Sequence, residues 1–353
     1  MSSNMMNLEN SVVVNGIKEH VMLQHPSTLT SKSVPPVPQK TSITLSAAGD
    51  FTIGSDESFG YDGTFKQEAD RNGLSYFTEN IKSLFTADDY TTVNLETTLT
   101  TSNQKAEKTF RFKGDPSYTK ILTEGGIEAV NLANNHIYDY LQKGFQDTIS
   151  ILQANNVGYF GNGYQHVTTV KGIKIGALGY NGWNDTRELR NEIKRDVETL
   201  RQEGVQLVLV HFHWGEERSY VPNHTQKSLG HYTIDTGADL VLGHHPHVLQ
   251  GIEEYNGKFI VYSLGNFMFG GNRNPSDKDT IVFQQTFHFE DNILLDQKEV
   301  EIIPYSISSV AFRNNYQPTP LQGAEAKRVM SKVLDLSAHI REPSWVAYEG
   351  SHQ

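Results

Sequence analysis

Residues 240–247 read Leu240-Val241-Leu242-Gly243-His244-His245-Pro246-His247, which places three imidazoles directly after an apolar run. Neutral imidazole is the commonest protein ligand for transition metals, so three rings within four positions favour a metal site. Pro246 has no backbone N–H, and we expect it to end a strand and leave the flanking rings at the rim of a sheet. The alternative is a histidine-rich surface turn, and the other strand ends of the chain bear on that choice.

Apolar runs of strand length alternate with amphipathic helical stretches from about Thr41 onward. This alternation is typical of a layered α/β domain. Toward the end of the chain, two β-rich runs at 280–289 and 294–305 flank the turn Glu290-Asp291-Asn292, which predicts a hairpin, and residues 324–336 have the pattern of a terminal helix. The earlier strands are expected at 43–48, 92–95, 129–132, 173–178, 207–213, 240–242 and 259–264, with helices at 144–155 and 192–203.

The first forty residues differ from the rest of the chain. Ser, Asn, Thr and Val dominate them, and residues 31–38 are rich in Pro, which is typical of a polyproline-type linker. We therefore expect residues 1–40 to be a flexible N-terminal segment and residues 41–350 to fold as a single domain. A native tail and the remains of a membrane-anchored region are both compatible with this composition.

Composition excludes several kinds of site. The 353 residues carry a formal net charge of −11, which argues against a general nucleic-acid or anionic-membrane surface. Because there is no cysteine, disulfides, thiolate zinc sites and cysteine nucleophiles are excluded, and any metal must be bound by His, Asp, Glu or Asn. No window approaches the roughly 18 to 20 consecutive apolar residues of a spanning helix, and residues 1–40 lack the plan of a secretory signal, so we expect a soluble chain.

Metal-competent polar side chains follow five of the expected strands. In an open α/β sheet, ligands bind in the crevice beyond the carboxyl ends of the strands, so these side chains should meet. Each alone has a simpler interpretation: Asp50 as a turn residue, Glu96 as a helix cap and His136 as a hydrogen-bonded core residue. Their joint occurrence favours a metal site, in which one of the alternating pair His211 and His213 lies behind the ligands or faces substrate. The side chains are Asp50; Glu96; Asn135 and His136 with Asp139; His211 and His213; and His244, His245 and His247.

Taken in order, these blocks resemble the poly-gamma-glutamate capsule synthesis protein CapA family, which is itself similar to a divergent branch of the calcineurin-like metallophosphoesterases. The resemblance runs from about residue 43 to residue 270, and its specificity comes from the combination of blocks. It rests on Gly49-Asp50, Asn94-Leu95-Glu96, Ala133-Asn134-Asn135-His136 with Asp139, His213-Trp214-Gly215, Gly243-His244-His245-Pro246-His247 and Tyr262-Ser263-Leu264-Gly265-Asn266-Phe267.

The resemblance implies an α/β fold, a four-layer αββα sandwich with a metal centre along one edge. It implies His136 as the catalytic acid, with Asp139 or a backbone carbonyl setting its tautomer, and it leaves His244 as an extra imidazole. One departure is Thr52, which stands where the superfamily usually has a His, so one metal position is weakened. The metal ligands implied by the resemblance are Asp50, Glu96, Asn135, His213, His245 and His247.

A second set of residues forms the candidate substrate contacts. The forked donors of Arg111 suit a carboxylate or a phosphate, although a surface ion pair is the alternative for this residue. Trp214 is expected to pack under the site rather than to bind substrate. The candidate substrate contacts are Arg111, His211, His244 and Asn266.

Three functions fit these features. The first is a metal-dependent hydrolase that acts in the biosynthesis, release or export of an anionic capsule polymer, which the resemblance identifies as poly-gamma-glutamate. The second is a stand-alone metallophosphoesterase for a small phosphorylated substrate, and the third is a non-catalytic polymer-binding subunit of a capsule synthesis complex. The expected cofactors are one or two divalent ions, Mn, Fe or Zn, with Glu96 as the bridging ligand. The expected partners are an anionic polymer or a phosphorylated small molecule and other capsule synthesis proteins, without nucleic acid, and the resemblance suggests the cell surface or the outer face of the membrane.

Overall fold

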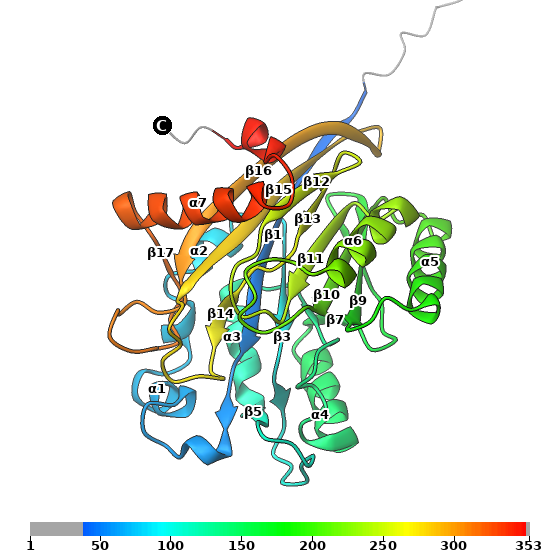
Figure 1. Cartoon of the computed structure of the whole chain (residues 1–353). Helices are drawn as coiled ribbons and strands as arrows, with labels where there is room; N and C mark the ends of the chain where they lie inside the picture. The colour runs from blue at the N-terminus through cyan, green and yellow to red at the C-terminus, as the bar shows by residue number, and fades with distance from the viewer. Residues whose placement is uncertain (1–37, 351–353) are drawn as a thin grey trace, which may run out of the picture. The chain divides into compact units, whose positions relative to one another are not determined.

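Two β-sheets packed face to face form the core of the structure, a computed structural model that describes residues 38–350 (Figure 1). The larger sheet has the strand order β17-β16-β15-β1-β3-β6-β7, with β14 paired to β1. The smaller sheet has the order β12-β13-β11-β10-β9-β8, and a third sheet of short strands has the order β2-β5-β4. The flexible N-terminal segment was expected at residues 1–40. Of these, residues 1–37 lie outside the described residues.

The elements have these bounds. The strands of the larger sheet are β1 (Lys40–Thr52), β3 (Tyr90–Leu95), β6 (Ala129–Asn131), β7 (Gly158–Phe160), β14 (Asn266–Phe269), β15 (Asp279–Glu290), β16 (Ile293–Ser306) and β17 (Thr319–Pro320). Those of the other sheets are β8 (His166–Val170), β9 (Ile173–Gly182), β10 (Leu207–Trp214), β11 (Leu240–His244), β12 (Ile252–Tyr255), β13 (Lys258–Val261), β2 (Ser55–Asp56), β4 (Thr98–Leu99) and β5 (Phe112–Gly114). The helices are α1 (Phe65–Asn72), α2 (Lys82–Phe85), α3 (Thr119–Gly125), α4 (Leu141–Ala154), α5 (Arg187–Gln202), α6 (His224–Thr236) and α7 (Gly323–Ala338), with 3-10 turns at Glu57–Phe59, Ser75–Thr78, Pro116–Tyr118 and Ser344–Tyr348.

The central strands are apolar on both faces because both faces are covered. In β10, Leu207 and Leu209 point into the core between the two sheets, whereas Val208 and Val210 point into the core on the outer face of the smaller sheet. Successive side chains of a strand point to opposite faces, so an unbroken apolar run is what a doubly covered strand requires.

Helices cover the outer face of each sheet. On the larger sheet, α4 contributes Phe145 and Leu152 to a core that also holds side chains of β3 and β6. The helices α5 and α6 lie along the smaller sheet (Figure 1). Val197 of α5 and Leu229 of α6 belong to a core that also holds side chains of β10 and β11. The layer sequence is therefore helix, sheet, sheet, helix, which confirms the expected four-layer αββα sandwich.

The expected elements all appear, with shifted ends. The hairpin is confirmed as β15 and β16, and it turns at Asp291 and Asn292 with φ of 50° and 65°, the left-handed conformation of tight hairpin turns. The strand expected at 259–264 ends at Val261. β1 extends further than expected, to Thr52, because the chain pairs with β3 and β14 beyond Ala47.

Gly49 allows this extension of β1. The backbone N–H of Asp50 donates to the carbonyl oxygen of Gly265 at 3.0 Å, and any Cβ at position 49 would fall far inside van der Waals contact with that same carbonyl. Asp50 is thereby placed opposite Asn94 of β3 and Asn266 of β14. The close approach of two backbones at Gly49 thus fixes the first candidate ligand.

We predict that Gly49→Ala lowers the free energy of unfolding by about 2 to 4 kcal/mol, because the added methyl group must push apart two paired backbones in a packed core. The matched control is Gly350→Ala, where a Cβ would meet no atom within 4 Å. Urea unfolding of the two variants measures the difference, and equal midpoints would contradict the prediction.

Asp88, in the turn before β3, is a half-buried acid remote from the strand ends described above. Its Oδ2 accepts a hydrogen bond from Thr91 Oγ1 at 2.6 Å, while its Oδ1 is buried without a hydrogen-bond partner among the described residues. Burial raises the pKa of this carboxyl to about 6, above its ordinary value of 3.8. The folded protein therefore binds a proton more tightly than the unfolded chain does.

We predict that the wild-type protein loses stability relative to Asp88→Asn as the pH rises from 4 to 8. The folded pKa is raised, so its stabilising contribution is complete below about pH 4 and is lost as the pH passes through 6, by at most about 3 kcal/mol. Free energies of unfolding at pH 4, 6 and 8 test this. Parallel pH profiles for the two proteins would show that Asp88 titrates normally.

Candidate metal centre

The side chains predicted from the strand ends meet at one edge of the facing sheets. β1, β3 and β6 are parallel neighbours in the larger sheet and bring Asp50, Glu96 and Asn135 to their carboxyl ends. β10 and β11 are parallel neighbours in the smaller sheet and bring His213 and His245 to theirs. Among these predicted ligands, the oxygen donors therefore come from the larger sheet and the imidazoles come from the smaller sheet.

Glu96 lies at the middle of this cluster and has no exposed surface. Its Oε1 is 3.5 Å from His213 Nε2, 3.7 Å from His247 Nε2 and 4.0 Å from His136 Nε2. Neither carboxylate oxygen has a hydrogen-bond partner within residues 38–350. Burying a carboxylate without a donor is costly, so this environment fits a side chain that binds a cation.

Asp50 is equally buried but is surrounded by donors. Its Oδ1 accepts a hydrogen bond from Asn94 Nδ2 at 2.8 Å and lies 3.5 Å from His244 Nδ1. Its Oδ2 is 3.1 Å from His247 Nδ1 and 3.4 Å from the backbone nitrogen of His245. Asp50 therefore connects the first strand of the larger sheet to the histidine loop of the smaller one.

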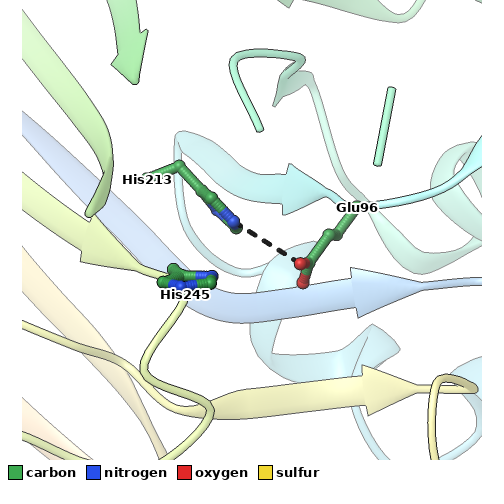
Figure 2. A group of neighbouring side chains, drawn as sticks. All are labelled: Glu96, His213 and His245. Carbon is green, nitrogen blue, oxygen red and sulfur yellow. Dashed lines mark ion pairs between the residues drawn. The ribbon is translucent and has the colours of Figure 1, made fainter. Parts of the chain in front are cut away.

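Three sets of ligand atoms are each compact enough to bind one ion, with all members within 4.8 Å of one another. Because the sets share Glu96, His245 and His247, they describe one connected centre rather than three sites. Carboxylate oxygens with imidazoles suit Mn, Fe and Zn, so the donor set fits the expected divalent ions. The sets are Glu96 with His213 and His245, drawn in Figure 2; Asp50 with Glu96 and His247; and Glu217 with His245 and His247.

The two buried carboxyls differ in protonation, because burial raises the pKa of Glu96 well above its ordinary value while that of Asp50 is lowered. Burial alone would raise the pKa of Asp50, but hydrogen bonds from His244 and His247 hold it well below its usual value. Burial disfavours the imidazolium of His247, but the carboxylates of Glu96 and Asp50 raise its pKa to about 10. Burial lowers the pKa of His213 and brings that of His245 to about 4, so these two rings are neutral, as metal ligation requires.

The histidine loop has an unusual backbone. His245 and His247 have φ of 97° and 57°, in the left-handed region that residues other than glycine rarely adopt. The carbonyl oxygen of Pro246 accepts a hydrogen bond from the backbone N–H of Arg218 at 2.7 Å, which helps to hold the loop. Backbone strain of this kind is concentrated at functional sites, and here it directs both rings toward Glu96 and Asp50.

His136 lies beside the cluster and is oriented from behind. Its Nδ1 is 2.6 Å from Asp139 Oδ2, and Asp139 Oδ1 accepts from Lys108 Nζ at 2.6 Å. The ring stacks on Phe112 with centroids 4.1 Å apart. With the Nδ1 proton donated to Asp139, the Nε2 atom is the one that faces Glu96, and burial lowers the pKa of the ring despite Asp139. Of the two expected ways to set this tautomer, the contacts favour Asp139.

Asn94 joins the ligands of both sheets, although its role was not predicted from the sequence. Its Nδ2 donates to Asp50 Oδ1 and lies 3.3 Å from His213 Nδ1, and its Oδ1 accepts from Asn131 at 2.9 Å and from Asn134 at 3.3 Å. The available signal was its position two residues before Glu96, at the end of β3, since side chains two residues apart in extended chain share one face.

His211 and His244 lie behind the cluster. Both are fully buried, and His211 Nδ1 is 2.9 Å from His244 Nε2, with the two rings stacked. His211 Nε2 also contacts the hydroxyl of Thr92 at 3.1 Å. A side chain without exposed surface does not reach substrate, so the expected substrate contact of these two residues is corrected to a supporting position.

A cleft of about 440 Å³ opens beside the centre. His136 and His247 line it from the cluster, and Asn266 lines it with its Oδ1 2.9 Å from His247 Nδ1. Glu217 and Arg218, which were not predicted from the sequence, also line it. Loop residues of this kind carry no periodic pattern from which their direction could be inferred.

Arg111 does not line this cleft. Its guanidinium donates to the carbonyl oxygens of Ala106 and Lys108, at 3.2 and 2.9 Å, so its donors serve its own loop. The cation at the cleft is instead Arg218, whose guanidinium forms no ion pair within the described residues. The expected contact of Arg111 with substrate is therefore not supported by its position, and Arg218 is the arginine that lines the cleft.

Three remaining predictions concern side chains at the edge of the cluster. Asn135 is exposed, and its Oδ1 lies 2.9 Å from His213 Nε2, so its amide oxygen is at the centre. Trp214 is buried, stacks on Phe212 and donates from Nε1 to Tyr262 O at 2.8 Å, which confirms its packing role. Thr52 is fully buried, and its hydroxyl has no hydrogen-bond partner among the described residues.

Comparisons with known proteins identify one family and several similar chains. The family model described as bacterial capsule synthesis protein PGA_cap matches residues 44–271. The chain is 30% identical over 293 residues to the capsule biosynthesis protein CapA of Bacillus anthracis. The aligned region covers 74% of this chain and 68% of that protein. It is 31% identical over 221 residues to the PGA biosynthesis protein CapA of Bacillus subtilis. This aligned region covers 57% of this chain and 58% of that protein. Among solved structures, a phosphatase of Mycoplasma pneumoniae aligns with a TM-score of 0.47 and 15% identity over 75% of this chain and 94% of that one.

We predict that His247→Ala abolishes metal loading, because this ring belongs to two of the three ligand sets and contacts both buried carboxylates. The matched control is His339→Ala, an exposed histidine at the end of α7. Mass-spectrometric metal analysis after loading with Mn²⁺ measures the ratio of metal to protein. An unchanged ratio in His247→Ala would exclude the residue as a ligand.

Proposed function

The chain belongs to the bacterial capsule synthesis protein family of the PGA_cap model, and we propose that it is a metal-dependent hydrolase acting in the biosynthesis, release or export of poly-gamma-glutamate. The observation that carries the proposal is Glu96, a buried carboxylate without hydrogen-bond donors, enclosed by His213, His245 and His247. A carboxylate in that setting is stabilised by a cation, and the family gives the biological process in which the centre acts.

Among the described residues that line the cleft, Arg218 is the one Lys or Arg side chain, and it suits a carboxylate of an anionic substrate. Poly-gamma-glutamate carries one carboxylate for each amide bond, and the planar guanidinium of Arg218 matches a carboxylate with two parallel donors. Asp277, which also lines the cleft, is already paired with Lys332 Nζ at 2.7 Å and with the hydroxyl of Tyr220 at 2.8 Å. Arg218 is therefore free to bind a carboxylate of the polymer beside the centre.

In the chemistry proposed for the centre, bound ions would polarise the substrate and the side chain of His136 would transfer protons. Divalent ions, when bound, act as Lewis acids toward an amide or phosphoryl oxygen. Because Asp139 accepts the Nδ1 proton of His136, the Nε2 atom carries the free lone pair. In hydrolysis this atom takes a proton from the attacking water and gives it to the leaving nitrogen, while a C–O bond forms and the C–N bond breaks. The residues that would hold the ions are Asp50, Glu96, Asn135, His213, His245 and His247.

A second candidate is a non-catalytic subunit that binds polymer carboxylates within a capsule synthesis complex. Thr52 is the observation that favours the non-catalytic subunit. Its buried hydroxyl stands where the metallophosphoesterases that this chain resembles have a metal-binding imidazole. Under either reading we propose other capsule synthesis proteins as partners and the cell surface as the location. Within residues 38–350, the structure contains no helix with the length and apolar character of a membrane span.

The test of the proposed function is incubation of the metal-loaded full chain with poly-gamma-glutamate, read by polymer length and by binding. Shortening of the polymer supports the hydrolase, and binding without shortening supports the non-catalytic subunit. A parallel assay with p-nitrophenyl phosphate measures phosphoesterase activity. Turnover of that ester with no effect on the polymer would overturn the proposal in favour of the stand-alone phosphoesterase.

We predict that His136→Ala retains metal and loses hydrolysis, by at least about 100-fold, since general acid–base catalysis contributes 10²- to 10⁴-fold. The reason is geometric: its Nε2 lies 4.0 Å from Glu96 at the edge of the cleft, outside the three ligand sets. Metal content and polymer shortening are measured on the same sample, with His339→Ala as the control. Loss of metal from His136→Ala would show that the ring is a ligand instead.

A further inference from the structure

We infer that Glu217 is an additional metal ligand, which binds a divalent ion together with His245 and His247 on the cleft side of the centre. Within the structure, one oxygen of Glu217 and one nitrogen of each ring lie within 4.8 Å of one another. Metal–ligand bonds of about 2.0–2.2 Å place the donors of one ion up to about 4 Å apart, so small side-chain movements complete this set. The inference rests on the proposed metal centre and adds a residue to it.

The turn that carries Glu217 is fixed against the histidine loop. Gly215 and Arg218 have φ of 81° and 62°, so the chain reverses tightly after β10. The backbone N–H of Arg218 then donates to the carbonyl oxygen of Pro246 at 2.7 Å, between the two ligand histidines. This contact places the carboxylate of Glu217 beside both rings, and it depends on backbone atoms rather than on a flexible side chain.

The surroundings of Glu217 leave its carboxylate available for an ion. It is exposed at the cleft, which His247 also lines, and it forms no ion pair with a Lys or Arg of residues 38–350. Its neighbour Glu216 is exposed as well but belongs to none of the ligand sets. The two adjacent carboxylates therefore differ in one relevant property, which is their distance from His245 and His247.

Glu217 also supplies what the centre otherwise lacks. Thr52 provides a hydroxyl in place of an imidazole, and the two buried carboxylates, Asp50 and Glu96, supply two negative charges. Two divalent ions carry four positive charges, and a third carboxylate brings the charge of the ligands closer to balance. Because Glu217 is exposed, the ion that it binds exchanges with solvent more readily than an ion enclosed by Glu96 and His213.

The experiment is titration of the metal-free full chain with Mn²⁺ by calorimetry, for the wild type, Glu217→Gln and Glu216→Gln. Loss of a residue that supports a ligand typically weakens metal binding 10- to 100-fold, so we expect Glu217→Gln to weaken the lower-affinity Mn²⁺ site at least tenfold. Glu216→Gln is expected to bind as the wild type does. Thermal unfolding without metal checks that the variants fold, and both replace exposed side chains.

Each outcome has one meaning. Weaker Mn²⁺ binding in Glu217→Gln alone supports the inference, whether the wild type binds one ion or two. Equal binding by all three proteins overturns the role of Glu217 and leaves the proposed centre intact. Weakening by the same factor in both variants overturns it too, since a general charge effect then explains the loss. A wild-type chain that binds no Mn²⁺ would overturn the centre and the inference together.

Discussion

The structure depends on the burial of two carboxylates at the edge of two facing sheets. Asp50 and Glu96 have no exposed surface, yet only Asp50 is surrounded by hydrogen-bond donors. A protein that buries an unsatisfied carboxylate pays several kcal/mol unless a cation compensates it, so this arrangement is retained only where it serves a function. The close backbone approach at Gly49, the asparagine Asn94 and the strained histidine loop all maintain the positions of these two groups.

The division of ligands between the sheets explains why the fold and the site are inseparable. The larger sheet contributes oxygen donors through parallel strands, and the smaller sheet contributes His213, His245 and His247. The two sets that contain Glu96 need side chains from both sheets, whereas Glu217, His245 and His247 all follow strands of the smaller sheet. The apolar core between them, which includes Leu45 and Leu209, therefore determines the distance between carboxylates and imidazoles. A change in the packing of that core would change the geometry of the centre, even without contact with it.

The sequence predicts side-chain direction in the strands, where the pattern is regular, but not in the loops. The unbroken apolar runs predicted the strands, and polar residues at their ends predicted the cluster, because parallel strands end at a common edge. Alternation alone did not show which histidine of β10 faces the cluster. His211 alternates with His213 but is buried behind the cluster, hydrogen-bonded to His244. Glu217 and Arg218 follow Gly215 in an irregular turn, and the direction of such side chains depends on tertiary hydrogen bonds that no local pattern encodes.

The turn after β10 carries two residues at the cleft, one a cation and the other a candidate metal ligand. Arg218 presents the free cation of the cleft, Glu217 lies beside His245 and His247, and one backbone hydrogen bond to Pro246 holds both residues. The backbone of Arg218 and the backbone of the histidine loop are thus held together by the same contact. In the proposed hydrolase, binding of a polymer carboxylate by Arg218 brings one amide bond of the repeat to the cleft that His136 also lines.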